Sequence, residues 1–165
     1  VPESRTAFVT AEVAGAFLAP PALPGDGDGA KAGLEQEEEG MMMTASICAI
    51  DRPDDMLLIT CGGEGKLGLR FVPTMSDDFP PGGDMNYRSD FVFASGSLSA
   101  EVTLRYEAMD GVLAATPRRD SDLARILKSA GPLTVTDKAG LLPAATFTLE
   151  GSSKAIGKVE KACYS

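Results

Sequence analysis

The sequence contains no histidine, and this absence excludes several classes of active site. A Ser-His-Asp triad, a Cys-His dyad and a histidine-ligated zinc site all need the missing imidazole. The glycine-rich stretch at 61–66 lacks the GxxxxGK[ST] spacing of a phosphate-binding loop, so it is predicted to be a hairpin turn. We therefore predict no catalytic residues, no cofactor and no metal site, and we expect that the protein is not an enzyme.

Basic residues are also scarce. Lys and Arg number 15 against 24 Asp and Glu, which gives a net charge of −9. A nucleic-acid-binding protein needs a basic face to meet phosphates, so no nucleic acid is expected as a partner. The most apolar stretch, 13–19, is far shorter than the roughly 20 residues of a membrane helix, and no membrane insertion is expected. The chain begins at Val1, which is compatible with a cleaved export signal.

The acidic residues are concentrated at the start of the chain. Residues 1–40 hold eight carboxylates against Arg5 and Lys31, together with many Pro and Gly residues. We predict that 1–40 is an acidic extension, with a strand or short helix over 6–18 and a mobile linker without regular structure over 20–40. Residues 41–165 are then a single mainly-β domain that ends in a helix.

From residue 41 onward the pattern is that of short strands separated by turns. In 100–106, for example, Val102, Leu104 and Tyr106 share one face and polar residues share the other, which is typical of a half-buried antiparallel strand. The predicted strands are 41–50, 56–61, 67–72, 91–93, 100–106, 111–115, 133–136 and 144–149.

Two later segments change to helical spacing. Leu123 and Leu127 are four residues apart in 120–128, where Asp120 or Ser121 is the expected N-cap, and a second apolar stripe marks a helix over 152–162. The predicted class is therefore α+β and mainly β: an antiparallel β-sandwich or a partly open barrel of seven or eight short strands with two late helices.

Three cysteines, Cys48, Cys61 and Cys163, are the disulfide candidates. A hairpin turning near 53–54 would place Cys48 opposite Ile59 and Cys61 opposite Ser46, so that these two cysteines lie diagonally on one face. A bridge from Cys163 to the sheet would instead fix the terminal helix and close a loop of roughly 100 residues. The remaining alternative is three small buried hydrophobes in a reduced protein.

The C-terminal half also carries a family-like pattern. A short helix and an apolar strand precede F-x-L-x-G at 147–151, and an alanine-rich helix then ends in Ala162-Cys163. Together with the strand-Cys-turn-strand stretch at 56–72, this pattern resembles small exported proteobacterial proteins of the type VI secretion-associated VasI/TagO family and of the invasion-associated locus B (IalB)-like family. Tyr164 stands where the VasI/TagO group has Trp. The resemblance implies a periplasmic or secreted protein and an accessory role in type VI secretion.

The long loop 75–88 is the predicted working surface. Apolar and aromatic side chains exposed on a loop are typical of protein contacts. The candidate contact residues are Phe79, Pro80, Pro81, Met85 and Tyr87. We expect a non-enzymatic exported accessory or binding domain with a protein partner in the cell envelope.

Two further expectations concern charge. An alternative function is an acidic inhibitor of a cell-wall hydrolase such as lysozyme, which would set acidic loops against a basic enzyme. The basic doublet Arg118-Arg119 precedes a predicted helix and is expected to lie on the surface.

Overall fold

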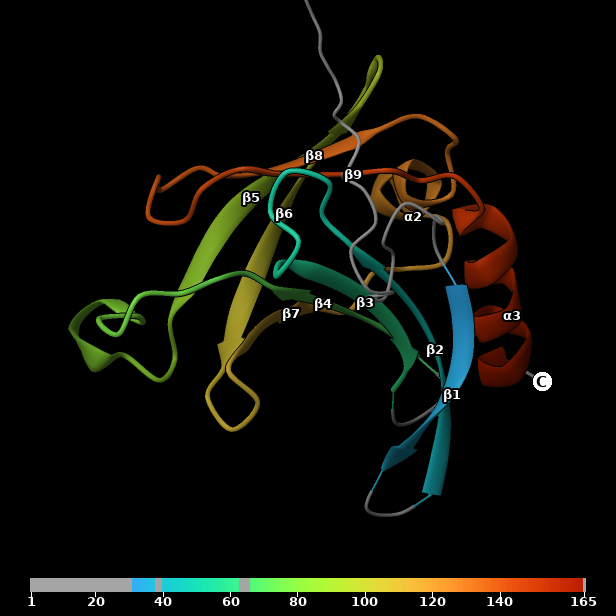
Figure 1. The fold of residues 1–165 in the computed structure, drawn as a ribbon, viewed down its shortest axis with the longest axis horizontal. Helices are drawn as coiled ribbons and strands as arrows, with labels where there is room; N and C mark the ends of the chain where they lie inside the picture. Colours follow the sequence, from blue (N-terminus) through green and yellow to red (C-terminus); the bar gives the residue numbers. More distant parts are fainter. Residues whose placement is uncertain (1–30, 38–39, 63–65, 165) are drawn as a thin grey trace, which may run out of the picture.

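In the part of the chain that the structure describes, nine antiparallel strands form one sheet, in the order β1-β2-β3-β4-β7-β6-β5-β8-β9 (Figure 1). The computed structural model describes residues 31–37, 40–62 and 66–164, so the helix or strand predicted at 6–18 and the first part of the predicted linker lie outside the described residues. The strands are β1 (Lys31–Glu37), β2 (Gly40–Cys48), β3 (Met56–Cys61), β4 (Leu67–Val72), β5 (Arg88–Ser95), β6 (Leu98–Glu107), β7 (Val112–Ala115), β8 (Leu133–Asp137) and β9 (Ala145–Phe147). Among the described residues, the helices are α2 (Asp122–Leu127) and α3 (Ser152–Tyr164), with one short 3-10 turn, η3 (Pro81–Gly83).

The two ends of this strand order come close together, so the sheet is a nearly closed barrel. The N–H of Ile50, just after β2, donates a 2.7 Å hydrogen bond to the carbonyl oxygen of Thr146 in β9. The N–H of Thr146 in turn donates to Oδ1 of Asp51, at 2.9 Å. The predicted class is confirmed: the domain is mainly β, and the partly open barrel rather than the sandwich describes the strands β2 to β9.

The strand β1 was not predicted, and it corrects the prediction of a linker over 20–40. Residues 31–37 pair with β2 along their whole length, from Lys31 opposite Ser46 to Glu37 opposite Gly40. The linker prediction relied on charge and on Pro and Gly, yet a strand at a sheet edge needs only backbone N–H and C=O groups that match its neighbour. The Pro residues of this segment all precede residue 25, outside β1.

A core of aromatic and aliphatic side chains fills the barrel. Four phenylalanines from three strands are at most 1% exposed: Phe71, Phe91, Phe93 and Phe147. The ring of Phe71 meets those of Phe91 and Phe147 edge to face, at 5.9 and 6.4 Å between centroids. These contacts join β4, β5 and β9, which are not neighbours in the strand order. The aromatic core therefore stabilises the curved shape of the sheet.

The two helices cover separate parts of the sheet. Helix α3 lies along β1, β2 and β3 (Figure 1), and its buried stripe includes Ala155, Ile156 and Val159. Helix α2 packs against β5 and β6, and its N-cap is Ser121, whose Oγ accepts the N–H of Ala124 at 3.2 Å. The sequence predicted both helices, and Ser121 was one of its two expected caps.

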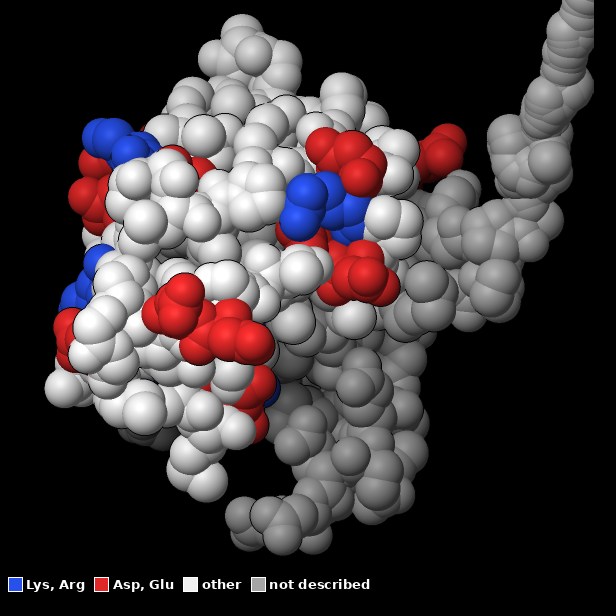
Figure 2. Space-filling view, turned by 60° about the vertical axis from the view of Figure 1, so that its left-hand side comes forward, with Lys and Arg blue, Asp and Glu red and all other residues white. Residues whose placement is uncertain are grey.

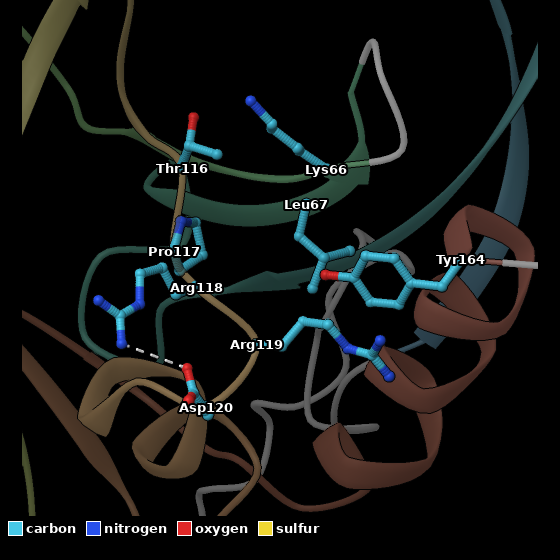
Figure 3. Close-up of a pocket in the computed structure, with 8 residues that line it drawn as sticks. All are labelled: Lys66, Leu67, Thr116, Pro117, Arg118, Arg119, Asp120 and Tyr164. Atoms are coloured by element: carbon cyan, nitrogen blue, oxygen red, sulfur yellow. Dashed lines mark ion pairs between the residues drawn. The ribbon is translucent and has the colours of Figure 1, made fainter.

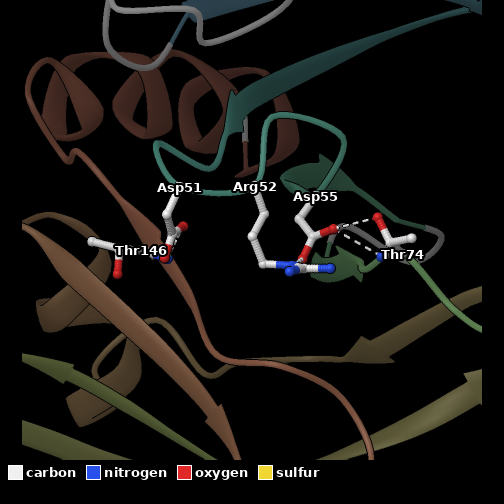
Figure 4. A network of polar contacts seen from close by, with 5 residues as sticks. All are labelled: Asp51, Arg52, Asp55, Thr74 and Thr146. Carbon is white, nitrogen blue, oxygen red and sulfur yellow. Dashed lines mark hydrogen bonds and ion pairs between the residues drawn. The ribbon is translucent and has the colours of Figure 1, made fainter.

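A buried carboxylate fixes the turn between β2 and β3 (Figure 4). Asp55 is 0% exposed, and its Oδ1 accepts hydrogen bonds from both the N–H and the hydroxyl of Thr74, each at 2.8 Å. The Nε of Arg52 lies 3.2 Å from Oδ2 of the same carboxylate. Because Thr74 follows β4, this network ties the β2–β3 turn to the start of the segment between β4 and β5.

Candidate functional site

A disulfide joins Cys61, at the end of β3, to Cys163, in the last turn of α3. The two Cα atoms are 5.2 Å apart, and the residues are separated by 102 positions in the sequence. This is the bridge from the terminal helix to the sheet that the sequence left as one alternative. It fixes the end of α3 against the turn between β3 and β4.

The predicted diagonal arrangement of Cys48 and Cys61 is wrong. Cys48 lies opposite Met56 in the β2–β3 hairpin, rather than opposite Ile59. The register therefore differs by three residues, and an odd shift moves a side chain to the other face of the sheet. The longer turn, in which the N–H of Ala49 bonds to the carbonyl of Asp55 at 2.9 Å, is the cause of the shift.

A pocket of about 730 Å³ lies next to this disulfide (Figure 3). Its walls come from the start of β4, from the connection between β7 and α2, and from the end of α3. The lining residues are Lys66, Leu67, Thr116, Pro117, Arg118, Arg119, Asp120 and Tyr164. The disulfide borders both walls, since Cys61 pairs with Leu67 across the sheet and Cys163 directly precedes Tyr164.

Three cations and one carboxylate set the electrostatics of the pocket. The guanidinium of Arg119 lies over the ring of Tyr164, 4.1 Å from its centroid. Arg118 and Asp120 approach to 3.5 Å, but their side chains are 82% and 80% exposed, so solvent screens this pair. An excess of positive charge beside an apolar wall suits an anionic ligand.

The sequence placed the doublet Arg118-Arg119 on the surface, but it predicted no pocket at this position. Arg118 and Arg119 are exposed, as predicted, yet the doublet also lines a cavity with Lys66 from another part of the chain. The signal available in the sequence was that Arg118-Arg119 is the one basic doublet. Its neighbours in space depend on the path of the β7–α2 connection, which no local pattern encodes.

The five predicted partner-contact residues all lie in the segment 73–87 between β4 and β5, but only two are fully exposed. Pro81 and Met85 are exposed, Pro80 is buried, and Phe79 and Tyr87 are half-buried. The ring of Phe79 meets Tyr87 at 5.2 Å and Tyr106 at 5.5 Å between centroids, edge to face in both cases. The expectation that all five are exposed is therefore corrected, because three rings bury one another here.

Within residues 31–37, 40–62 and 66–164, no group of three or more His, Cys, Asp or Glu residues is placed to hold a metal ion. Neither α2 nor α3 combines the length and the apolar character of a helix that crosses a membrane.

Comparison with known proteins assigns no family to the chain. No protein-family model matches it, and neither a curated protein nor a solved structure does so.

Proposed function

We propose that the protein is a non-enzymatic binding domain that is exported to the periplasm or secreted, where it contacts a protein of the cell envelope. The disulfide between Cys61 and Cys163 is the observation that carries this proposal. Disulfides persist in oxidising compartments and are rare in the cytosol, where thiols are kept reduced. The resemblance to the VasI/TagO and IalB-like families favours the same address, and an accessory role in type VI secretion belongs to this proposal.

Mass spectrometry of the protein from its native host tests the compartment. The protein is alkylated with and without prior reduction, and its peptides are then mapped. We expect a linked pair of peptides that contain Cys61 and Cys163, and alkylation of these two thiols only after reduction. Alkylation of all three thiols without reduction would contradict export.

The segment 73–87 is the surface that we assign to the protein partner. The cluster of Phe79, Tyr87 and Tyr106 supports it from below, and the N–H of Tyr106 donates to the carbonyl of Tyr87 at 2.9 Å. Its outer side presents Met85, which is 62% exposed, beside exposed carboxylates. Figure 2 brings this end of the molecule forward and shows acidic side chains in groups on it. A supported apolar centre with an acidic rim suits a partner with a basic rim.

Site-specific crosslinking in living cells tests this surface. A photoreactive amino acid replaces Met85 in one variant and Leu98, at the far end of the β5–β6 hairpin, in the control. Both side chains are exposed, so neither replacement disturbs the core. We expect one discrete crosslinked product from position 85 and none from position 98. Identical products from both positions, or none from either, would reject this segment as the contact surface.

Inhibition of a cell-wall hydrolase is the second candidate function, and the charge of the same segment favours it. The exposed carboxylates are Asp77, Asp78 and Asp84. An acidic surface of this kind attracts a basic enzyme such as lysozyme, and added salt screens the attraction. We would measure lysis of bacterial cells by lysozymes of several classes, at low and high salt. Absence of inhibition in every class would remove this candidate.

A further inference from the structure

We infer that the pocket between the start of β4, the β7–α2 connection and the end of α3 binds a small organic anion, with a carboxylate or phosphate head and an apolar tail. This goes beyond the proposed contact with a protein partner and does not depend on it. The pocket and the segment 73–87 share no residue.

The lining of the pocket carries an excess of positive charge. The chain carries a net charge of −9, yet three of its 15 cationic side chains, Lys66, Arg118 and Arg119, line this one pocket. The single carboxylate among the lining residues, Asp120, lies 3.5 Å from Arg118 in a highly exposed pair. Exposed ion pairs contribute little free energy, so an anionic ligand competes easily for that guanidinium.

The side chain of Arg119 is held against an aromatic ring. Its guanidinium stacks on the ring of Tyr164 at 4.1 Å, and this contact restrains the plane of the group (Figure 3). A stacked guanidinium keeps its N–H donors in its own plane, where they form a fork that matches a carboxylate or phosphate. The stack therefore presents a donor group whose orientation is set before the ligand arrives.

The pocket also has an apolar wall. Leu67 is buried, and Pro117 and Tyr164 are half-buried, and all three line the same pocket as the cations. The volume of about 730 Å³ lies within the range of about 300–1,000 Å³ that is usual for small-molecule sites. Cationic side chains around an apolar wall suit a molecule with one charged end and one apolar end.

A second hollow extends the site along α3. It has a volume of about 360 Å³, and it shares Arg119 and Tyr164 with the first while adding Lys161 and Glu160. Glu160 pairs with Lys128 at 2.7 Å, so its charge is compensated within the protein. The stacked pair of Arg119 and Tyr164 thus lies between two hollows, and positive charge is present in both.

A fluorescence titration of the full, oxidised chain tests the inference. The probe is 1-anilinonaphthalene-8-sulfonate, an aromatic anion that brightens in apolar surroundings. We expect saturable binding, displaced by octanoate, octyl phosphate or both, but not by octylamine of the same tail length. The ratio of the two displacement constants identifies the preferred head group. Octylamine that displaces the probe as well as octanoate would overturn the assignment of an anion site.

Matched variants locate the binding on the molecule. We expect Arg119→Gln and Lys66→Gln each to weaken probe binding by about tenfold, since each removes one charge-assisted contact. The control is Arg125→Gln, an exposed arginine on α2 outside the pocket, which should bind the probe like the wild type. Thermal melts show that each variant is folded. Equal binding by folded Arg119→Gln, or no saturable binding by the wild type, would overturn the inference.

Discussion

Ile50 and Thr146 close the barrel through a 2.7 Å hydrogen bond between the backbone N–H of Ile50 and the carbonyl oxygen of Thr146. Thr146 lies in β9, the last strand of the sheet order, whereas Ile50 follows β2 near the other end. The side chain of Asp51 accepts the N–H of the same threonine (Figure 4), so both backbone groups of Thr146 are bound by one turn. The turn after β2 therefore acts as a short substitute strand beside β9.

Asp51→Ala should loosen this closure. The substitution leaves the N–H of Thr146 without its 2.9 Å acceptor and should lower the free energy of unfolding by about 1 kcal/mol. Urea denaturation measures the change. Asp54→Ala, in an exposed neighbour of the same turn, is the control and should stay within about 0.5 kcal/mol of the wild type. Equal stability of the two variants would argue that the closure contributes nothing.

Asp55→Ala should lower the free energy of unfolding more than Asp51→Ala does. Asp55 is 0% exposed, and its loss removes the acceptor of both Thr74 donors as well as the partner of Arg52. Unsatisfied buried groups of this kind predict a loss of about 3 kcal/mol in unfolding free energy. Chemical denaturation of both variants in parallel shows which variant has the lower free energy of unfolding. If Asp55→Ala proves the milder variant, the buried network is not what holds the β2–β3 turn.

Loss of the disulfide should destabilise the whole domain. It closes a loop of about 100 residues, for which the chain-entropy model gives up to about 4.7 kcal/mol. We expect dithiothreitol to lower the melting temperature of the wild type and to leave that of the double variant Cys61→Ala, Cys163→Ala unchanged. This comparison separates the disulfide from Cys48, which both proteins retain. If dithiothreitol lowers the melting temperature of both proteins equally, the loss of stability does not come from this disulfide.

Phe79→Ala and Met85→Ala should have different effects: the first should lower the stability of the segment 73–87, and the second should weaken binding of the protein partner. Phe79 makes two edge-to-face contacts beneath the surface, so its removal should cost about 2 kcal/mol, less than for a fully buried ring. Met85 is exposed, and its removal should leave the melting temperature unchanged while it reduces binding of the partner. Thermal melts of both variants test this division. A destabilised Met85→Ala protein would contradict the assignment of Met85 to the outer surface.

Redox state should also affect the anion pocket. Cys163 directly precedes Tyr164, and Cys61 pairs with Leu67, so the disulfide holds two lining residues in place. We expect the double cysteine variant, at a temperature where it is still folded, to bind 1-anilinonaphthalene-8-sulfonate about tenfold more weakly than the oxidised wild type, since a misplaced wall loses preorganisation. Identical affinity would mean that the walls keep their places without the bridge.

Strands with clear alternation were predicted to the residue. The predicted strand 67–72 coincides with β4, because every second side chain in it is apolar and faces the core. The predicted strand 56–61 coincides with β3, as a short apolar run between two turns. The predicted bounds of a strand were too short where polar residues pair with the neighbouring strand. β5 runs from Arg88 to Ser95 rather than over 91–93, since its polar first residues also pair with β6, where the hydroxyl of Thr103 donates to Oδ1 of Asp90.

The sequence by itself determined the class of the domain, most of its strands, both helices and the candidate cysteines. These properties are local: periodicity, turn residues and caps decide them within a few positions of the chain. Only the tertiary structure decided which cysteines pair, that β1 joins the sheet, that the rings of 73–87 bury one another, and that Arg119 meets Tyr164. Each of these depends on a register or on the curvature of the sheet, where a shift of one residue reverses the face of every side chain.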